Sequence, residues 1–227
     1  MMGRHFEHLL ENLKNDLIGM AHLVDEQLDA AYSALFDDNL DMAQRVVARD
    51  AEVDTWDTRI DNECQEIFAV VQPVAMDLRL LMAALKINGQ LERIGDIAMN
   101  IAERVRVLSG YREFLRATRL QEMAEIARIM VRDSLDAIIH NNPTIATRVL
   151  ESDDVVDALD RQIFQQLVRE MKADHRVIEP ASHIMILSRH LERLADHATN
   201  IAEDVIFMVD ALVIKHHADE KTEKEEE

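Results

Sequence analysis

The chain contains one fifteen-residue motif twice, and this internal repeat limits the possible folds more than any other feature. Residues 91–105 read LERIGDIAMNIAERV, and residues 191–205 read LERLADHATNIAEDV. Aligned without a gap at an offset of 100, the two copies share ten identical positions. Self-similarity at a fixed spacing marks a repeated structural unit. We therefore predict that the 227 residues fold as two similar halves.

Composition and periodicity indicate an all-α fold. The chain has only 5 glycines and 3 prolines, and its apolar residues recur at spacings of three and four, as in amphipathic helices. The prolines lie where this periodicity breaks, which indicates turns. The pattern predicts six long helices, at about residues 5–35, 40–71, 76–108, 113–140, 143–172 and 180–214. With short turns between them, we expect two tandem antiparallel three-helix bundles.

Turn residues predict where one half ends and the next begins. Gly110 follows the third predicted helix, and glycine is favoured directly after a helix C-terminus. Asn142 and Pro143 fit an N-cap followed by a first-turn proline, and the Asp37-Asp38-Asn39 cluster fits a turn and the N-cap of the second helix. We predict a first bundle over residues 1–110, a second over residues 111–215 and an acidic tail over residues 216–227.

Charge and hydropathy restrict the possible partners and the compartment. The net charge is −19, which repels nucleic acid and anionic membranes but favours cations and basic protein surfaces. The single Cys64 excludes an internal disulfide. The longest apolar run, at residues 205–214, contains Asp210 and has about half the ~20 residues that span a bilayer. The first twenty residues lack the apolar segment of a signal peptide. We therefore expect a cytoplasmic protein without membrane insertion.

The polar positions of each motif copy fall on one side of a helix. They are spaced i, i+4, i+8 and i+11, which places them within about 80° of one another. These residues are Glu92, Asp96, Asn100 and Glu103 in the first copy, and Glu192, Asp196, Asn200 and Glu203 in the second. The helix before each copy carries a stripe spaced i, i+4 and i+7, formed by Asp50, Asp54 and Asp57 in the first half and by Asp153, Asp157 and Asp160 in the second.

The turn positions predict that the two stripes of each half lie at the same height. In antiparallel helices, residues at one level have numbers that sum to about twice the turn centre. With turns near residues 74 and 176, Asp54 is level with about residue 94 and Asp157 with about residue 195. These levels are next to Asp96 and Asp196. If the stripes also face each other, each half holds a cluster of carboxylates.

Such a cluster needs compensation, because close carboxylates repel one another. One explanation is a solvated acidic face with arginine partners, for which the neighbouring candidates are Arg49, Arg93, Arg104, Arg161 and Arg193. The other is a bound cation. Ligands that are all oxygen suit hard ions such as magnesium, calcium, manganese or iron. Because the stripes occur in matched pairs, we favour cation binding.

Two other features of the motif helices are open to more than one interpretation. His183, His190 and His197 repeat every seven residues on a line that is rotated away from the acidic stripe, so we predict packing or interface roles for them. Gly89 and Gly95 lie inside the third predicted helix, where each costs about 1 kcal/mol relative to alanine. Close helix approach, room for a ligand, or no specific role would each account for these glycines.

The motifs described above closely resemble those of the PhoU family. The resemblance covers about residues 5–212 and includes the motif copies, the Asp-x-x-x-Asp segments of the preceding helices, and QPVAMDLR at residues 72–79. It implies a pair of three-helix bundles whose acidic motifs bind metal clusters, commonly iron, with zinc, magnesium and manganese as alternatives. The metal ligands that it implies are Asp50, Asp54, Glu92 and Asp96, and Asp153, Asp157, Glu192 and Asp196. Geometry adds Asp57, Asp160, Asn100, Asn200, Glu103 and Glu203 as candidates.

The resemblance also implies a function. Members of this family are cytoplasmic negative regulators of phosphate uptake that link the phosphate ABC transporter ATPase to the membrane histidine kinase of the phosphate system, often as homodimers. We expect no enzymatic activity, because the chain lacks a phosphate-binding loop, a nucleophile elbow and a basic groove. The alternatives are a metal-dependent phosphohydrolase, for which no base or basic clamp accompanies the stripes, and a purely structural helical bundle.

Overall fold

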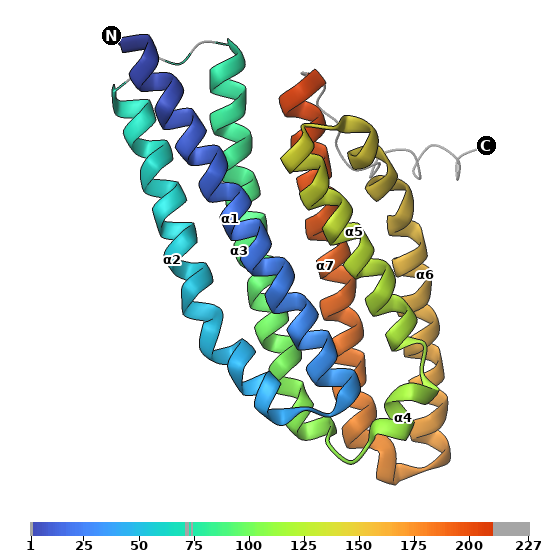
Figure 1. The fold of residues 1–227 in the computed structure, drawn as a ribbon. Helices are drawn as coiled ribbons and strands as arrows, with labels where there is room; N and C mark the ends of the chain where they lie inside the picture. Colours follow the sequence, from blue (N-terminus) through green and yellow to red (C-terminus); the bar gives the residue numbers. More distant parts are fainter. Residues whose placement is uncertain (1, 71–72, 74, 211–227) are drawn as a thin grey trace, which may run out of the picture.

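The computed structural model describes residues 2–70, 73 and 75–210, and this part of the chain contains helices and no strand. The elements are α1 (Met2–Asp37), α2 (Leu40–Val70), α3 (Ala75–Leu108), α4 (Arg112–Ala117), α5 (Leu120–His140), α6 (Pro143–Ala173), a short 3-10 helix η1 (His175–Val177) and α7 (Ile178–Asp210). The helices α1, α2 and α3 pack into one bundle, and α5, α6 and α7 pack into a second (Figure 1). The all-α prediction is confirmed, and each predicted long helix except the fourth forms one helix within the described residues. The predicted acidic tail lies outside the described residues.

Capping residues lie at the helix termini where the sequence predicts them. The Oδ1 atom of Asn39 accepts a hydrogen bond from the backbone N–H of Met42 at 3.0 Å. Gly110 follows α3 with a φ of 88°, a left-handed conformation that glycine adopts without strain. The Oδ1 atom of Asn142 accepts from the backbone N–H of Thr144 at 3.0 Å, directly before α6. Each cap satisfies backbone groups that the helix end leaves without partners.

The predicted helix over residues 113–140 is wrong in one respect, because it is broken into α4 and α5. Thr118 has an extended backbone, with a φ of −90° and a ψ of 165°. Its hydroxyl donates to the carbonyl of Leu115 at 2.7 Å and accepts from the N–H of Leu120 at 3.3 Å. These local bonds replace helical ones. The break also buries both Leu115 and Leu120, which explains why the apolar periodicity continues across it.

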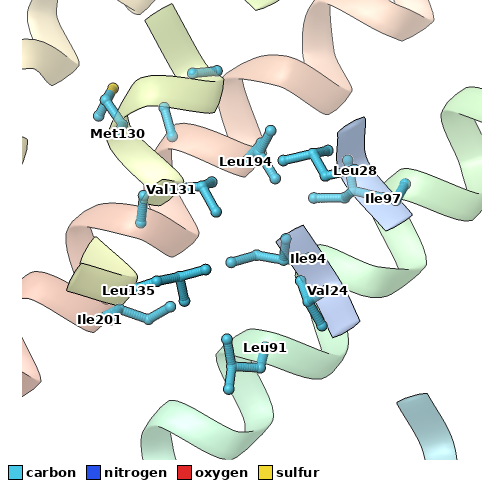
Figure 2. Packing of buried hydrophobic residues seen from close by; sticks show 14 of the residues in the cluster. Val24, Leu28, Leu91, Ile94, Ile97, Met130, Val131, Leu135, Leu194 and Ile201 are labelled. Carbon is cyan, nitrogen blue, oxygen red and sulfur yellow. The ribbon is translucent and has the colours of Figure 1, made fainter. Parts of the chain in front are cut away.

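The two bundles share one hydrophobic core. The helices α3 and α7, which carry the motif copies, pack along each other, and α1 packs against α5. Ile94 and Leu194 occupy equivalent motif positions, and both are fully buried. In Figure 2 they lie among side chains of both halves, including Leu28 from α1 and Val131 from α5. The apolar face of each motif therefore joins the halves, and its acidic face is left for α2 or α6.

Ion pairs also connect the two bundles. Lys86 of α3 donates to Asp204 of α7 at 2.7 Å. Between α1 and α5, Arg132 pairs with Asp25 at 3.1 Å and with Asp29, and Arg128 pairs with Asp29 at 3.3 Å. None of the helices that the structure describes has an apolar stretch long enough to cross a membrane.

Candidate metal centre

The helices α2 and α3 pack closely at Gly95, between the two acidic stripes of the first half. A Cβ atom at Gly95 would lie only 3.0 Å from Cγ1 of Val53, which is closer than ordinary van der Waals contact. Val53 lies between Asp50 and Asp54 on α2, and Gly95 directly precedes Asp96 on α3. Of the roles considered for Gly95, the structure therefore favours close helix approach. This approach positions the stripes opposite each other.

We call Asp50, Asp54, Asp57, Glu92 and Asp96 the first cluster. Burial raises the pKa of Glu92, and the charges of Asp96, Asp57 and Asp54 raise it further, while Arg93 lowers it. Burial also raises the pKa of Asp50, followed by the charges of Asp96 and Asp54. Since these repulsions cross from α2 to α3, the two stripes face each other. The turn positions predict the common height of the stripes but leave their rotation open.

Neutral groups make the direct contacts of the first cluster. The side-chain amide of Asn88, which is fully buried, donates to Oδ1 of Asp57 at 2.8 Å and to Oδ1 of Asp61 at 3.1 Å. The pKa of Asp57 is raised by burial first and then by Asp61 and Asp54. Sequence reasoning missed Asn88 because it precedes the motif. An amide fixes the carboxylates without cancelling their charge.

No arginine in the described part of the chain forms an ion pair with the carboxylates of the first cluster, although the charge of Arg93 lowers the pKa of Glu92. Within the described residues, no Lys or Arg forms an ion pair with Asp50, Asp54, Asp57 or Glu92. Arg49, one of the expected partners, instead pairs with Glu52 at 3.4 Å and with Glu26 at 3.6 Å. Of the expected partners, Arg93 acts on Glu92 through its charge, so the explanation by arginine partners holds for this half only in part.

We call Asp157, Asp160, Glu192 and Asp196 the second cluster. Burial raises the pKa of Glu192, and Asp196 raises it further; Arg189 opposes this rise, and Asp160 and Asp157 add to it. The hydroxyl of Ser188 donates to Oδ1 of Asp160 at 2.7 Å. The stripes on α6 and α7 thus also meet, at positions that match those of the first cluster.

Arginine does compensate the second cluster. Arg189 lies 3.0 Å from Oδ2 of Asp160 and 3.5 Å from Oε1 of Glu192. Arg161 lies 3.3 Å from Oδ2 of Asp157. Sequence reasoning included Arg161 among the candidate partners but missed Arg189, which precedes the second motif copy. Comparison of the two copies could have found it, because the first copy has a glycine at the equivalent position.

The remaining candidates occupy other surroundings. The amide of Asn100 donates to the backbone carbonyl of Asp96 at 2.7 Å, within its own helix. Asn200 and Glu203 line a cleft of about 360 Å³ beside α3. Glu103 is exposed on α3, and Asp153 is half-buried on α6.

The donors of the first cluster suit a hard cation in their chemistry but not in their spacing. They are carboxylate oxygens whose mutual repulsion a cation would relieve. Within the described residues, no three or more His, Cys, Asp or Glu side chains stand close enough together to hold a metal ion. Binding would therefore require the carboxylates to move closer together. In the second cluster, a cation would have to compete with guanidinium groups already in place.

The histidine line lies between the two halves, in agreement with its predicted packing role. His197 is buried, and its Nδ1 atom is 2.7 Å from Oε1 of Gln90 on α3. The imidazole donates in this contact, and its other nitrogen is buried without a partner. Burial lowers the pKa of His197 to about 4, and the charges of Arg93 and Arg193 add to this effect.

A pH prediction follows from this environment. The unfolded chain takes up a proton at His197 near pH 6.5, whereas the folded chain does so only near pH 4. Stability is therefore lost as the pH falls through this window, by about 3 kcal/mol. His197→Gln, which can still hydrogen-bond to Gln90, removes this contribution. Urea unfolding of both proteins from pH 7 to pH 4 measures the difference; parallel curves would contradict the prediction.

The fold and its clusters define a class of protein: an all-helical chain built from two copies of one bundle, each with an acidic motif. The model of the PhoU domain matches residues 17–105 and 120–205, and the chain therefore belongs to the PhoU family. A phosphate-specific transport system accessory protein PhoU homolog from Aquifex aeolicus is 39% identical over 94% of this chain and 97% of the relative. A protein of the same description from Zymomonas mobilis is 36% identical over 89% of this chain and 85% of its own length.

Solved structures agree with this assignment. The crystal structure of PhoU from Pseudomonas aeruginosa has a TM-score of 0.86 at 34% identity, and the match covers 91% of this chain and 100% of that one. The regulatory protein PhoU from Streptococcus pneumoniae, at 24% identity, has a TM-score of 0.84 over 92% of this chain and 99% of its own. The latter similarity establishes the fold alone.

Proposed function

We propose that this protein is a cytoplasmic, metal-binding negative regulator of phosphate uptake. In this role it links the phosphate ABC transporter ATPase to the membrane histidine kinase of the phosphate system, as a homodimer and without enzymatic activity. Its relatives are phosphate-specific transport system accessory proteins, and the match extends over nearly their full length. The observation that carries the proposal is the pair of acidic motifs in a member of this family. In each half of the chain, the motif helix lies against a second helix with an acidic stripe.

The proposed mechanism is control of a charged surface. A bound cation, whether iron, magnesium, manganese, zinc or calcium, would supply positive charge at the acidic stripes. The residues that would hold it in the first half are Asp50, Asp54, Asp57, Glu92 and Asp96. These carboxylates repel one another between α2 and α3. Relief of the repulsion would stiffen this pair of helices and change the surface that they offer to a basic partner.

Two measurements test the proposal. Elemental analysis of the protein, purified without a metal-binding tag, should find metal that is lost when Glu92, Asp96, Glu192 and Asp196 are changed to alanine. Co-purification with the transporter ATPase and the histidine kinase, in high and low phosphate, should recover at least one partner. Association with neither partner in both conditions would contradict the adaptor role. Phosphatase turnover that is lost in Glu92→Gln would instead favour the hydrolase alternative.

A matched control variant distinguishes the effect of losing the motif carboxylates from the effect of changing the net charge. The control variant removes four exposed acids of α1, α2, α4 and α6, and these are Glu7, Glu66, Glu113 and Glu170. It changes the net charge by the same amount as the motif variant, so it should retain metal and partners. Both variants should keep the helical circular-dichroism spectrum of the parent. Equal loss of binding in both would show that net charge, and not the clusters, is recognised.

A further inference from the structure

A cleft of about 650 Å³ lies between α6 and α7. Its walls come from residues 160–165 of α6 and residues 185–193 of α7. Eight residues of a helix rise by about 12 Å, so the cleft extends over about two helical turns. A space of this length and volume is typical of a site for a small molecule, whereas a docked protein usually covers a surface of about 800 Å² on each partner.

Apolar side chains line part of this cleft and remain accessible to solvent. Phe164 of α6 is 56% exposed, and Ile186 of α7 is 37% exposed. Met185 lies beside them and packs against the core. Burial of such side chains against a ligand is favourable, and an aromatic ring also gains from contact with a second flat ring. These residues therefore suit the apolar body of a small molecule.

Three arginines line the same cleft, and they differ in their partners. Arg161 pairs with Asp157 at 3.3 Å, and Arg189 pairs with Asp160 at 3.0 Å. Arg193 is exposed and, among the residues that the structure describes, forms no ion pair. A guanidinium group offers a planar set of donors that matches a carboxylate or a phosphate group. Arg193 is therefore available to an anionic group of a ligand.

The electrostatic surroundings of His190 show that this side of the cleft is positive. His190 also lines the cleft. Burial lowers the pKa of its imidazole, and the charges of Arg104 and Arg193 lower it further. The chain as a whole has a net charge of −19, so a positive region is an exception on this protein. Such a region attracts small anions that the rest of the surface repels.

The acidic residue in the lining, Asp160, does not cancel this attraction. Its Oδ1 atom accepts a hydrogen bond from the hydroxyl of Ser188 at 2.7 Å, and its Oδ2 atom lies 3.0 Å from Arg189. Its charge is therefore compensated within the protein, and the side chain is only 14% exposed. The charge of Arg193 has no such compensation from an ion pair.

We propose that the cleft between α6 and α7 binds a small organic anion with a flat apolar body. Phe164 and Ile186 contact the apolar body, and Arg193 pairs with the anionic group. This inference goes beyond the proposed function, because the site requires neither a metal ion nor a partner protein. It gives the protein a site through which a soluble compound of this class can act on the second half.

Two fluorescent probes that differ only in charge test the proposal. Anilinonaphthalene sulfonate has a flat aromatic body and one anionic group, and phenylnaphthylamine is the same molecule without the sulfonate. The full chain should bind the sulfonate in one saturable event. Phe164→Ala should weaken the binding of both probes about ten-fold. Arg193→Gln should weaken the sulfonate about ten-fold and change the uncharged probe less than about two-fold.

Matched variants outside the cleft control for general binding of the probes. Arg93→Gln removes the equivalent arginine of the first motif copy, which lines a different cleft, and Ile129→Ala removes an apolar side chain of α5 that is 50% exposed. Both should bind the sulfonate as the parent does. All four replaced side chains are exposed, so each variant should keep the helical circular-dichroism spectrum. No saturable binding by the parent, or equal losses in Arg93→Gln and Arg193→Gln, would overturn the proposal.

Discussion

Leu194→Ala should lower the free energy of unfolding by about 3 kcal/mol and the Tm by about 6–12 °C. Leu194 is fully buried in the core that the two bundles share, where Figure 2 shows it facing side chains of the first half, including Leu28. Truncation removes apolar contacts and leaves a cavity that packed helices on both sides fill only in part. Differential scanning calorimetry measures both quantities.

The same experiment tests whether the two halves unfold together. Ile94→Ala is the matched variant, since Ile94 is the equivalent residue of the first motif copy and is also fully buried. Because each side chain packs across the junction, either truncation should shift one common transition. Two separate transitions, with only one of them moved by each variant, would show that the halves are thermodynamically independent.

Lys86→Met should cost about 2 kcal/mol at pH 8 and progressively less toward pH 5. Lys86 is the ion-pair partner of Asp204, at 2.7 Å, and the Asp204 side chain is only 10% exposed. Burial raises the pKa of Asp204, and Lys86 opposes that rise. Without the lysine the pKa rises further, so the folded state binds a proton that the unfolded chain releases. The penalty is therefore greatest at high pH and disappears as the pH falls.

Rescue variants give this prediction its control. Lys86→Met combined with Asp204→Leu removes both charges and should recover most of the lost stability, because no unpaired carboxylate stays buried. Lys86→Arg keeps the charge and should cost less than Lys86→Met. Denaturant unfolding at pH 8 and pH 5 measures all of these proteins. A penalty for Lys86→Met that does not depend on pH would show that Asp204 is not the group responsible.

Periodicity predicted most of the fold, because long amphipathic helices are determined by local sequence. The failure at Thr118 has a local cause as well: its hydroxyl bonds to the backbone on both sides, at Leu115 and Leu120. The apolar spacing continues through this break. A pattern of buried residues therefore cannot reveal that the helix has ended.

The candidate site was predictable in position but not in its charge balance. Turn positions alone indicated that Asp54 and Asp96 lie at one level, and the coupling of both residues to Glu92 confirms that the stripes meet. Rotation about a helix axis and side-chain reach are decided by packing. For this reason the sequence did not reveal that Asn88 reaches Asp57 or that Arg189 spans two helices.

The shared core has an evolutionary consequence. Since the apolar faces of α3 and α7 cover each other, neither copy of the duplicated unit could be lost or exchanged without exposing buried residues of the other. The carboxylates of the two clusters lie toward α2 and α6 and are free of this constraint. Selection could thus preserve the apolar contact between α3 and α7 in both copies while one copy diverged in its polar residues. A duplication that began as two identical sites could in this way give rise to two sites with different tasks.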